Sequence, residues 1–336
     1  MKKISSSFLS VLFVLLAIST VIAYWIFANN VFGPTTKVVV GPKWVNQAQF
    51  AGIYSAKEQY IYRKYGLDVE VKEFDFETNQ FEDLMNGKTD FAILSAEEVL
   101  LLANDNEPIK AVAAIYQVSP YAIVSLAEAK IETPADFKNK VLGNKGGKLE
   151  GELIYKLLLN SVGLNSNDSK IKSVDFEFSE YEDLINRKAD AVQLYRTDQL
   201  YYFDKKAIDY DIIYPEHFGI DTFNDIIITK KDFIEKNPEV VGNFIAATVE
   251  GWNYSIENPE RSVSDTMKYV THESYRDYDY ELFILNQSIP LIKPNVDIDV
   301  GSMTSNKWKE LYESMVEKKL VKDIVLKDFF TTEFLP

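Results

Sequence analysis

The chain contains no cysteine and only two histidines, His217 and His272. The absence of cysteine excludes disulfides, thiolate catalysis, cysteine-ligated metal centres and a lipid-modified N-terminal cysteine. The sequence has no His-x-x-x-His pair, no serine-nucleophile motif and no metal-binding cluster of acids. The Gly-x-Gly-x-x-Gly fingerprint and the phosphate-loop spacing are also missing. We therefore expect a protein that is not an enzyme and that holds no cofactor and no metal.

Basic residues are fewer than acidic ones, 36 Lys and Arg against 51 Asp and Glu, which gives a formal net charge of −15 at pH 7. Binding to nucleic acid or to an anionic membrane surface relies on clustered Lys and Arg, so both are disfavoured. Aromatic residues are plentiful, with 4 Trp, 20 Tyr and 21 Phe. This is more than a minimal core needs, and we expect some of these rings to contact a ligand.

The first thirty residues differ in character from the rest of the chain. Lys2 and Lys3 precede an uncharged apolar stretch over 8–27, long enough to span roughly 30 Å as a helix. A cleaved signal peptide has a shorter apolar core of about 7–15 residues, although Val21-Ile22-Ala23 would also suit a signal peptidase. We expect residues 1–30 to be an uncleaved signal anchor, or else a signal peptide, with the remainder outside the cytoplasm.

Two segments, 74–94 and 174–194, nearly repeat each other at a spacing of one hundred residues. Phe81-Glu82-Asp83-Leu84 in the first corresponds to Tyr181-Glu182-Asp183-Leu184 in the second. Each copy is typical of a strand, an amphipathic helix and a second strand. The period is too long for a solenoid, so the repeat predicts two similar α/β lobes. Convergence of both segments on a common βαβ pattern is the alternative.

The order of elements predicts an α/β fold in which the chain crosses between the lobes twice, near 122–128 and near 222–228. Paired crossovers would act as a hinge, because they permit bending at a few backbone torsions. Lobe 1 would then comprise 37–122 and 228–336, and lobe 2 would comprise 126–222.

The first strand is expected at 37–41. It is followed by a helix over 47–65 that ends at Gly66, where left-handed backbone is needed. In open α/β sheets ligands bind beyond the carboxyl ends of the strands. That rule brings these residues toward one cleft: Trp44, Ser95, Tyr116, Gly146 and Tyr195.

Aromatic and amide side chains near the first strand are candidates for ligand contact. A flat ring could stack on Trp44, Phe50 or Tyr54. Phe50 and Tyr54 are four residues apart, so they could instead pack their helix on the sheet. Gln47 either contacts the ligand or begins the helix. Ser95 is equally typical of a helix N-cap.

Acids and glycines complete the predicted cleft. Gly146 and Gly147 precede a predicted helix and would let a ligand approach the backbone. Glu150 or Glu152 could accept a hydrogen bond from an amine, although acids in a first turn also stabilise a helix start. An acidic, aromatic cleft favours an amino-substituted ring, because an analogue without the amine leaves a buried acceptor unpaired. The other polar candidates are Glu97, Thr197, Asp198, Asp221 and Asp225.

The segment over 39–54, Val-Val-Gly-Pro-Lys-Trp-Val-Asn-Gln-Ala-Gln-Phe-Ala-Gly-Ile-Tyr, resembles the opening of ABC-transporter substrate-binding proteins related to thiamine-pyrimidine-precursor synthase and to alkanesulfonate-binding proteins. The similarity continues through 90–98, 134–138 and 237–254. It implies a type II periplasmic-binding-protein fold that captures a small molecule and delivers it to a membrane permease and its ATPase. Family ligands include aminopyrimidine vitamin precursors, riboflavin, alkanesulfonates and nitrate.

The same resemblance includes an enzymatic branch. That branch is a pyrimidine synthase that consumes its own histidine and holds pyridoxal phosphate on a lysine. In this sequence Phe50 occupies the corresponding histidine position, which argues against that activity. We expect a small, flat, nitrogenous ligand, with a sensor of the same fold as a further alternative.

Overall fold

The computed structural model describes most of the chain outside its N-terminal region. Within the described ranges, every helix is too short or too polar to traverse a bilayer. The predicted signal anchor over 1–30 lies almost entirely outside the described residues. These are residue 15 and residues 18–20, 33–74, 79–145, 149–174, 180–317, 319–322 and 324–336.

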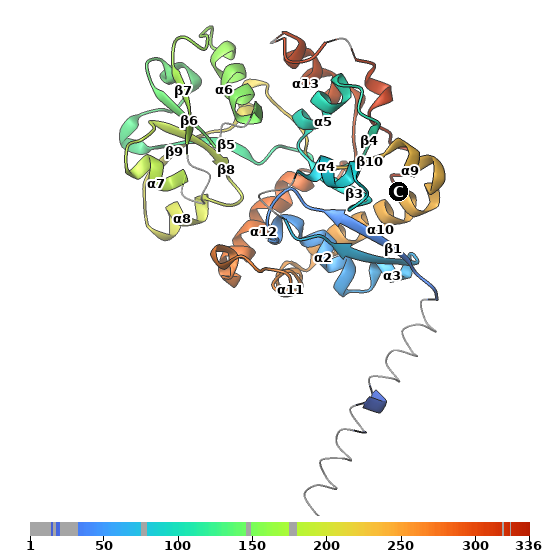
Figure 1. Cartoon of the computed structure of the whole chain (residues 1–336). Helices are drawn as coiled ribbons and strands as arrows, with labels where there is room; N and C mark the ends of the chain where they lie inside the picture. Colours follow the sequence, from blue (N-terminus) through green and yellow to red (C-terminus); the bar gives the residue numbers. More distant parts are fainter. Residues whose placement is uncertain are drawn as a thin grey trace, which may run out of the picture.

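The first of two sheets consists of β1 (Thr36–Gly41), β2 (Leu67–Val71), β3 (Phe91–Leu94), β4 (Ile109–Tyr116) and β10 (Asn224–Lys230). Its strand order is β2-β1-β3-β10-β4 (Figure 1). β1 runs parallel to β2 and β3, whereas β10 is antiparallel to β3 and β4. The sheet is therefore mixed.

The second sheet repeats this arrangement with β5 (Tyr121–Leu126), β6 (Val141–Lys145), β7 (Lys170–Val174), β8 (Ala191–Tyr195) and β9 (Tyr210–Ile213). Its order is β7-β6-β8-β5-β9, with β5 antiparallel to both of its neighbours. Strand by strand, it matches the order of the first sheet. The predicted α/β class is confirmed, and we call each sheet with its packed helices a lobe.

Two aspartates show that the sequence repeat is also a structural repeat. Asp90 accepts a hydrogen bond from the Val39 amide at 2.8 Å, and its own amide donates to the Val39 carbonyl at 2.8 Å. Asp190 makes the same pair of bonds with Val141, at 2.7 and 2.8 Å. In each lobe, one carboxylate ties the start of a strand to its parallel neighbour.

The chain passes from the first sheet to the second between Tyr116 and Tyr121, and returns between Ile213 and Asn224 (Figure 1). The first passage lies a few residues before the predicted one, since 121–126 already pairs within the second sheet. Pro120 precedes this ladder and has no amide to donate.

The helix predicted over 47–65 is wrong as a single element. The structure divides it into η1 (Ala48–Phe50), α2 (Ala51–Glu58) and α3 (Ile61–Lys64). Tyr60 interrupts it with a left-handed backbone, at φ 59°. The predicted left-handed Gly66 is confirmed, at φ 72°.

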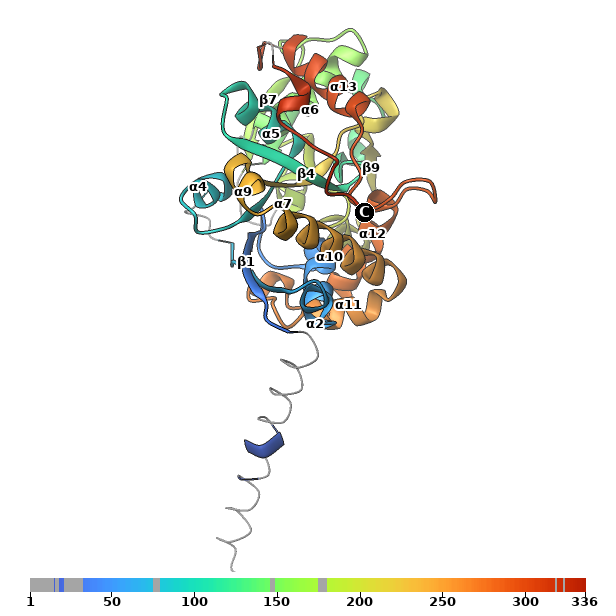
Figure 2. The ribbon, with the colours of Figure 1, turned by 90° about the vertical axis from the view of Figure 1, so that its right-hand side faces the viewer.

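Close helix packing covers one face of the first sheet. α2 lies against α10 (Pro238–Glu257), and α11 (Pro259–Thr266) lies beside both (Figures 1 and 2). A Cβ on Gly52 would lie 2.3 Å from the Trp252 ring, and one on Gly251 would lie 2.3 Å from the Gly52 carbonyl oxygen. The two helices can approach so closely because neither glycine carries a side chain. Below them, Phe244 stacks on Phe91 with ring centroids 4.0 Å apart.

The C-terminal region of the first lobe reaches the second lobe. Tyr280, in α12 (Tyr278–Ile292), stacks on Tyr201 of α8 (Leu200–Lys205) with ring centroids 4.8 Å apart. The Lys205 ammonium is 3.2 Å from Asp277, which caps α12. The remaining described helices are α4 (Gln80–Met85), α5 (Ala96–Asn104), α6 (Leu149–Ser161), α7 (Glu180–Ile185), α9 (Lys231–Lys236), α13 (Ser305–Glu317), η2 (Ala127–Ala129), η3 (Pro134–Phe137), η4 (Pro215–Phe218), η5 (Glu273–Tyr275) and η6 (Leu326–Asp328).

Candidate functional site

Asp225, at the start of β10, is the centre of a buried polar group. Its carboxylate accepts hydrogen bonds from Gln49 Nε2 at 2.9 and 3.0 Å and lies 3.0 Å from Lys43 Nζ. The residue is 1% exposed and has a left-handed backbone, with φ 49°. Burial raises the pKa of Asp225, while Lys43 and Gln49 oppose that rise. The start of β10 thus places a carboxylate where two polar side chains from the end of β1 converge.

Tyr195 brings the second lobe to the same place. Its hydroxyl donates a long hydrogen bond of 3.5 Å to Asn224 Oδ1, an atom that also accepts from Lys43. The Lys43 ammonium lies 5.5 Å from the centre of the Tyr195 ring. Tyr121 packs edge-on against that ring at 4.5 Å. Lys43 therefore contacts side chains from both lobes.

A second part of the site is built on Asp198, in the turn after β8. Its Oδ2 accepts hydrogen bonds from Tyr275 and Gln199, each at 3.0 Å, and its Oδ1 accepts from Tyr280. The Tyr275 hydroxyl also accepts from Trp44 Nε1 at 3.2 Å. Trp44 and Asp198, on different lobes, are thus linked through one tyrosine.

Glu281, in the first turn of α12, lies beside this part. Its Oε2 accepts a hydrogen bond from the Ala48 amide at the start of η1. Burial raises the pKa of Glu281 to about 9, the Ala48 amide opposes this, and the negative charge of Asp198 adds to it. Two carboxyl groups, one from each lobe, are therefore close enough for their charges to interact. We call the following residues the interlobe cluster: Lys43, Trp44, Gln47, Gln49, Tyr195, Asp198, Asn224, Asp225, Tyr275, Tyr280 and Glu281.

Several predicted site residues belong to the interlobe cluster. Trp44, Gln47, Tyr195, Asp198 and Asp225 all lie in it, and Gln47 Nε2 donates to Gln49 at 3.3 Å. Tyr116 lies next to the cluster, where its hydroxyl shares a 2.7 Å hydrogen bond with Ser288. Burial and the nearby Asp225 raise the pKa of Tyr116.

Other predicted residues have contacts away from the interlobe cluster. Phe50 is in the hydrophobic core of the first lobe. Tyr54 is buried, donates to Asn46 at 2.8 Å and stacks on Tyr269 at 4.8 Å. Both side chains pack within the first lobe. This is the packing role that the sequence offered as the alternative to ligand contact.

The remaining polar predictions divide into caps and ion pairs. Ser95 forms a capping box with Glu98 at the start of α5, and Glu97 is buried in the same turn. Asp221 is 2.6 Å from Lys307, and Glu152 is 2.6 Å from Lys156. Thr197 is buried in the turn beside Asp198. Gly146, Gly147 and the Glu150 side chain lie outside the described part of the chain, so these predictions stay untested.

Some cluster residues were missed by the sequence analysis. Lys43, Gln49 and Asn224 each lie within two residues of a predicted position, so local sequence carries a signal for them. Tyr275 and Glu281 follow the segment that resembles the family, and no nearby motif marks them. Glu281 is brought to the site by the packing of α12 on η1, and Tyr275 by its hydrogen bonds with Trp44 and Asp198.

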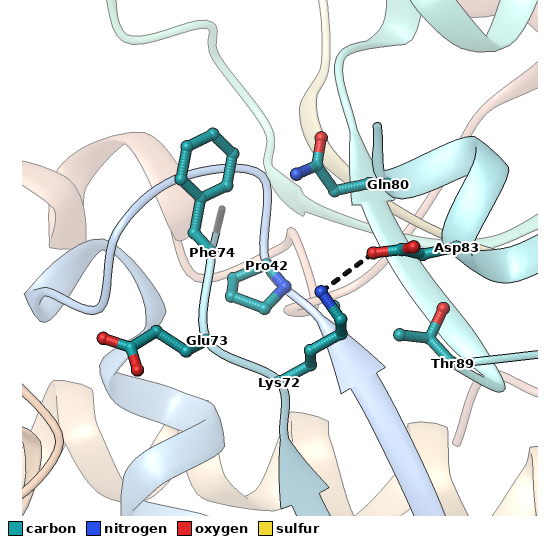
Figure 3. Close-up of a pocket in the computed structure, with 8 residues that line it drawn as sticks. Pro42, Lys72, Glu73, Phe74, Gln80, Asp83 and Thr89 are labelled. Atoms are coloured by element: carbon teal, nitrogen blue, oxygen red, sulfur yellow. Dashed lines mark ion pairs between the residues drawn. The ribbon is translucent and has the colours of Figure 1, made fainter. Parts of the chain in front are cut away.

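A small cavity adjoins the site at the carboxyl ends of β1 and β2 (Figure 3). Its volume of about 10 Å³ holds about one water molecule and no ring. Phe74 of its lining lies 5.5 Å from the Trp44 ring, and Lys72 is 2.9 Å from Asp83. The cavity is lined by Gly41, Pro42, Lys72, Glu73, Phe74, Gln80, Asp83 and Thr89.

The fold matches solved structures of binding proteins. The periplasmic aliphatic sulphonate-binding protein SsuA of Escherichia coli superposes with a TM-score of 0.69 at 14% sequence identity, covering 87% of this chain and 91% of that one. Two lobes that meet around a polar cluster define the chain as a protein with the periplasmic-binding-protein fold.

The family follows from the sequence comparison. Residues 47–262 match the family model described as NMT1/THI5 like, and the chain belongs to that family. The riboflavin-binding protein RibY of Chloroflexus aurantiacus is 22% identical over 320 residues, which cover 92% of this chain and 89% of the relative. The formylaminopyrimidine-binding protein of Halalkalibacterium halodurans is 21% identical over 298 residues, covering 86% and 88%.

Proposed function

We propose that this protein is the extracytoplasmic solute-binding component of an ABC importer, and that it captures a small, flat, nitrogenous ligand between its lobes. The observation that carries the proposal is the buried Asp225 carboxylate, which Lys43 and Gln49 hold at the contact between the two lobes. An ionised carboxylate can accept about four hydrogen bonds, so beside those from Lys43 and Gln49 it can accept one more from an amine or a ring N–H of the ligand, and it favours a ligand that carries such a donor.

The aromatic side chains support a planar ligand. Trp44, Tyr195 and Tyr275 approach the polar atoms of the interlobe cluster from both lobes. Aromatic faces stack on planar rings and add about 0.5–1.5 kcal/mol beyond buried area. The two relatives are named for riboflavin and for a formylaminopyrimidine, which are both flat and rich in nitrogen.

An alkanesulfonate or nitrate is the main alternative ligand class. Such an anion needs several converging cationic or amide donors. In the interlobe cluster Lys43 is 3.0 Å from Asp225, and nearby Arg196 is 2.6 Å from Glu216. Because each of these two cations is already paired with a carboxylate, the site favours the nitrogenous ligand over an anion. A pyridoxal-phosphate-dependent pyrimidine synthase is the enzymatic alternative, and a visible chromophore on the purified protein would support it.

The lobes would close by bending at the two passages between the sheets, within 117–120 and 214–223. Lobe 1, predicted as 37–122 and 228–336, then ends at the first passage and also includes β10 from Asn224 onward. Lobe 2, predicted as 126–222, begins at Tyr121 and ends at the second passage. The closed protein would then deliver its ligand to a permease and its ATPase. We further propose that residues 1–30 anchor the protein at the outer face of the cytoplasmic membrane. Carbonate extraction of cell membranes tests this, because an anchored chain stays in the pellet and a cleaved one is released.

Thermal unfolding of the full chain, purified in mild detergent, tests the ligand class. We expect an aminopyrimidine or riboflavin to raise the midpoint, and an alkanesulfonate and nitrate to leave it unchanged. Asp225→Asn should weaken binding of the aminopyrimidine about tenfold, since a charge-assisted hydrogen bond is replaced by a neutral one. Glu257→Gln, at an exposed position of α10, is the control. A shift with the sulfonate alone would overturn the proposed ligand class.

A further inference from the structure

Two buried oxygen atoms near the start of η1 have no hydrogen-bond partner among the residues that the structure describes. They are Glu281 Oε1 and Gln47 Oε1. Glu281 is 0% exposed and Gln47 is 1% exposed. An unpaired buried polar atom is costly, so two of them close together need a physical explanation.

The two residues are neighbours in space through Ala48. Glu281 Oε2 accepts from the amide of Ala48, which directly follows Gln47. Glu281 also directly follows Tyr280, whose hydroxyl donates to Asp198 of the second lobe. Gln47 donates to Gln49, which in turn donates to Asp225, so both unpaired atoms belong to residues of the interlobe cluster.

The hydrogen bonds already formed fix the chemistry of the unpaired atoms. The Ala48 amide donates to Glu281 Oε2, so a neutral Glu281 carries its proton on Oε1 and presents a donor. Gln47 Nε2 already donates to Gln49, so the amide of Gln47 presents its oxygen as an acceptor. Burial raises the pKa of Glu281 to about 9, which keeps this carboxyl neutral at pH 7.

We propose that Glu281 and Gln47 form a specificity-determining pair that recognises an acceptor beside a donor on the ligand, such as a ring nitrogen next to an amine. Glu281 donates its Oε1 proton to the ring nitrogen or to a carbonyl oxygen. Gln47 accepts from the neighbouring N–H. This inference rests on the proposed function, and it adds a second recognition point to Asp225.

The competing role for Glu281 is purely structural, as a cap that ties α12 to the start of η1. A cap needs only the hydrogen bond from Ala48 to Oε2. It does not depend on whether a ligand has a ring nitrogen. The test must therefore measure the coupling between the side chain and that ligand atom.

Isothermal titration of the full chain, in mild detergent, with an aminopyrimidine and with the aminobenzene of the same substitution measures this coupling. We expect Glu281→Leu to weaken aminopyrimidine binding about tenfold or more and to change aminobenzene binding much less. Glu281→Gln keeps an acceptor for Ala48 and a donor for the ligand, so its affinity at pH 7 should stay within about threefold of the wild type. Wild-type affinity should fall above about pH 9, and that of Glu281→Gln should not. Glu257→Leu is the matched surface control.

The outcomes separate this inference from the proposed function. Equal weakening of both probes by Glu281→Leu overturns the inference and leaves Glu281 as a cap. Loss of binding in Glu281→Gln as severe as in Glu281→Leu overturns the donor role. A folded wild type that binds neither the two probes nor riboflavin overturns the proposed ligand class and this inference together.

Discussion

Lys43 and Asp225 are far apart in the sequence, yet they form a buried pair 3.0 Å apart. Removing two opposite charges from water costs several kcal/mol, and their mutual attraction and added hydrogen bonds offset this. Gln49 supplies two such hydrogen bonds to Asp225. Without Lys43 the carboxylate would keep its desolvation cost and lose its main compensation.

We expect Lys43→Met to lower the free energy of unfolding by about 3 kcal/mol at pH 7. The folded pKa of Asp225 is already raised above its usual value of 3.8, and losing Lys43 raises it further. Above pH 3.8 the unfolded chain releases this proton more readily than the folded one, so stability falls as pH rises. The defect should therefore shrink as pH falls toward 4. Urea unfolding between pH 4 and 8, followed by tryptophan fluorescence, measures it.

The double variant Lys43→Met/Asp225→Asn is the control for charge. It removes both charges and keeps an acceptor for Gln49, so its stability should vary less with pH than that of Lys43→Met. A defect of the same size at every pH in the single variant would show that lost packing, and not an uncompensated carboxylate, is responsible.

At the scale of elements, α10 contains two glycines with different surroundings. A Cβ on Gly251 would lie 2.3 Å from the Gly52 carbonyl oxygen and 2.6 Å from the Ala56 Cβ, whereas one on Gly242 would meet only Phe334, at 3.7 Å. Backbone atoms of α2 cannot move aside as a flexible side chain can. The close approach of the two helices therefore depends on Gly251 and not on Gly242.

We expect Gly251→Ala to destabilise the protein by about 3 kcal/mol, at the upper end of overpacking effects. Gly242→Ala is the matched control in the same helix and should be neutral or stabilising by up to about 1 kcal/mol, because alanine favours helix. Urea unfolding of both variants at pH 7 gives the comparison. Equal stability of the two variants would mean that α2 and α10 separate at little cost.

Much of the element order is predictable from the sequence because it depends on local patterns. The repeat of 74–94 at 174–194 predicts two equivalent lobes, and Asp90 and Asp190 make equivalent hydrogen bonds in them. The break at Tyr60 is not predictable in this way. Its left-handed backbone contradicts the intrinsic preference of an aromatic residue, and tertiary packing on both sides determines it.

The candidate site can likewise be predicted only where local sequence determines which residues lie in it. Trp44 and Tyr195 follow from the rule that ligands bind beyond the carboxyl ends of strands, since Trp44 lies shortly after β1 and Tyr195 is the last residue of β8. Tyr275 and Glu281 could not be found in this way, because they lie after the last strand and reach the site through contacts with Asp198 and with η1. Phe50 and Tyr54 share one helix with Gln49, and periodicity alone does not separate the face that packs from the face that binds.

At the scale of the whole molecule, Asp198 is one of the residues through which the two lobes make contact. This carboxylate in the second lobe accepts hydrogen bonds from Tyr275 and Tyr280 of the first lobe. Hydrogen bonds to a charged group are worth about 1.5–3 kcal/mol each. The arrangement of the lobes in this structure is therefore stabilised by two hydrogen bonds to a charged group.

Tyr280→Phe should shift the protein toward an open state, because it removes one donor to Asp198 and keeps the ring that stacks on Tyr201. Loss of about 1.5 kcal/mol corresponds to roughly a tenfold change in the ratio of closed to open molecules. Release of a bound aminopyrimidine, followed by stopped-flow fluorescence, should be faster by about that factor. Tyr278→Phe is the control, since its hydroxyl donates within the first lobe to the Glu260 carbonyl at 3.0 Å. If both variants released the probe at the wild-type rate, the hydrogen bond from Tyr280 to Asp198 would not hold the lobes together, and closure would depend on the other contacts between them, such as the Tyr280–Tyr201 stack and the Lys205–Asp277 pair.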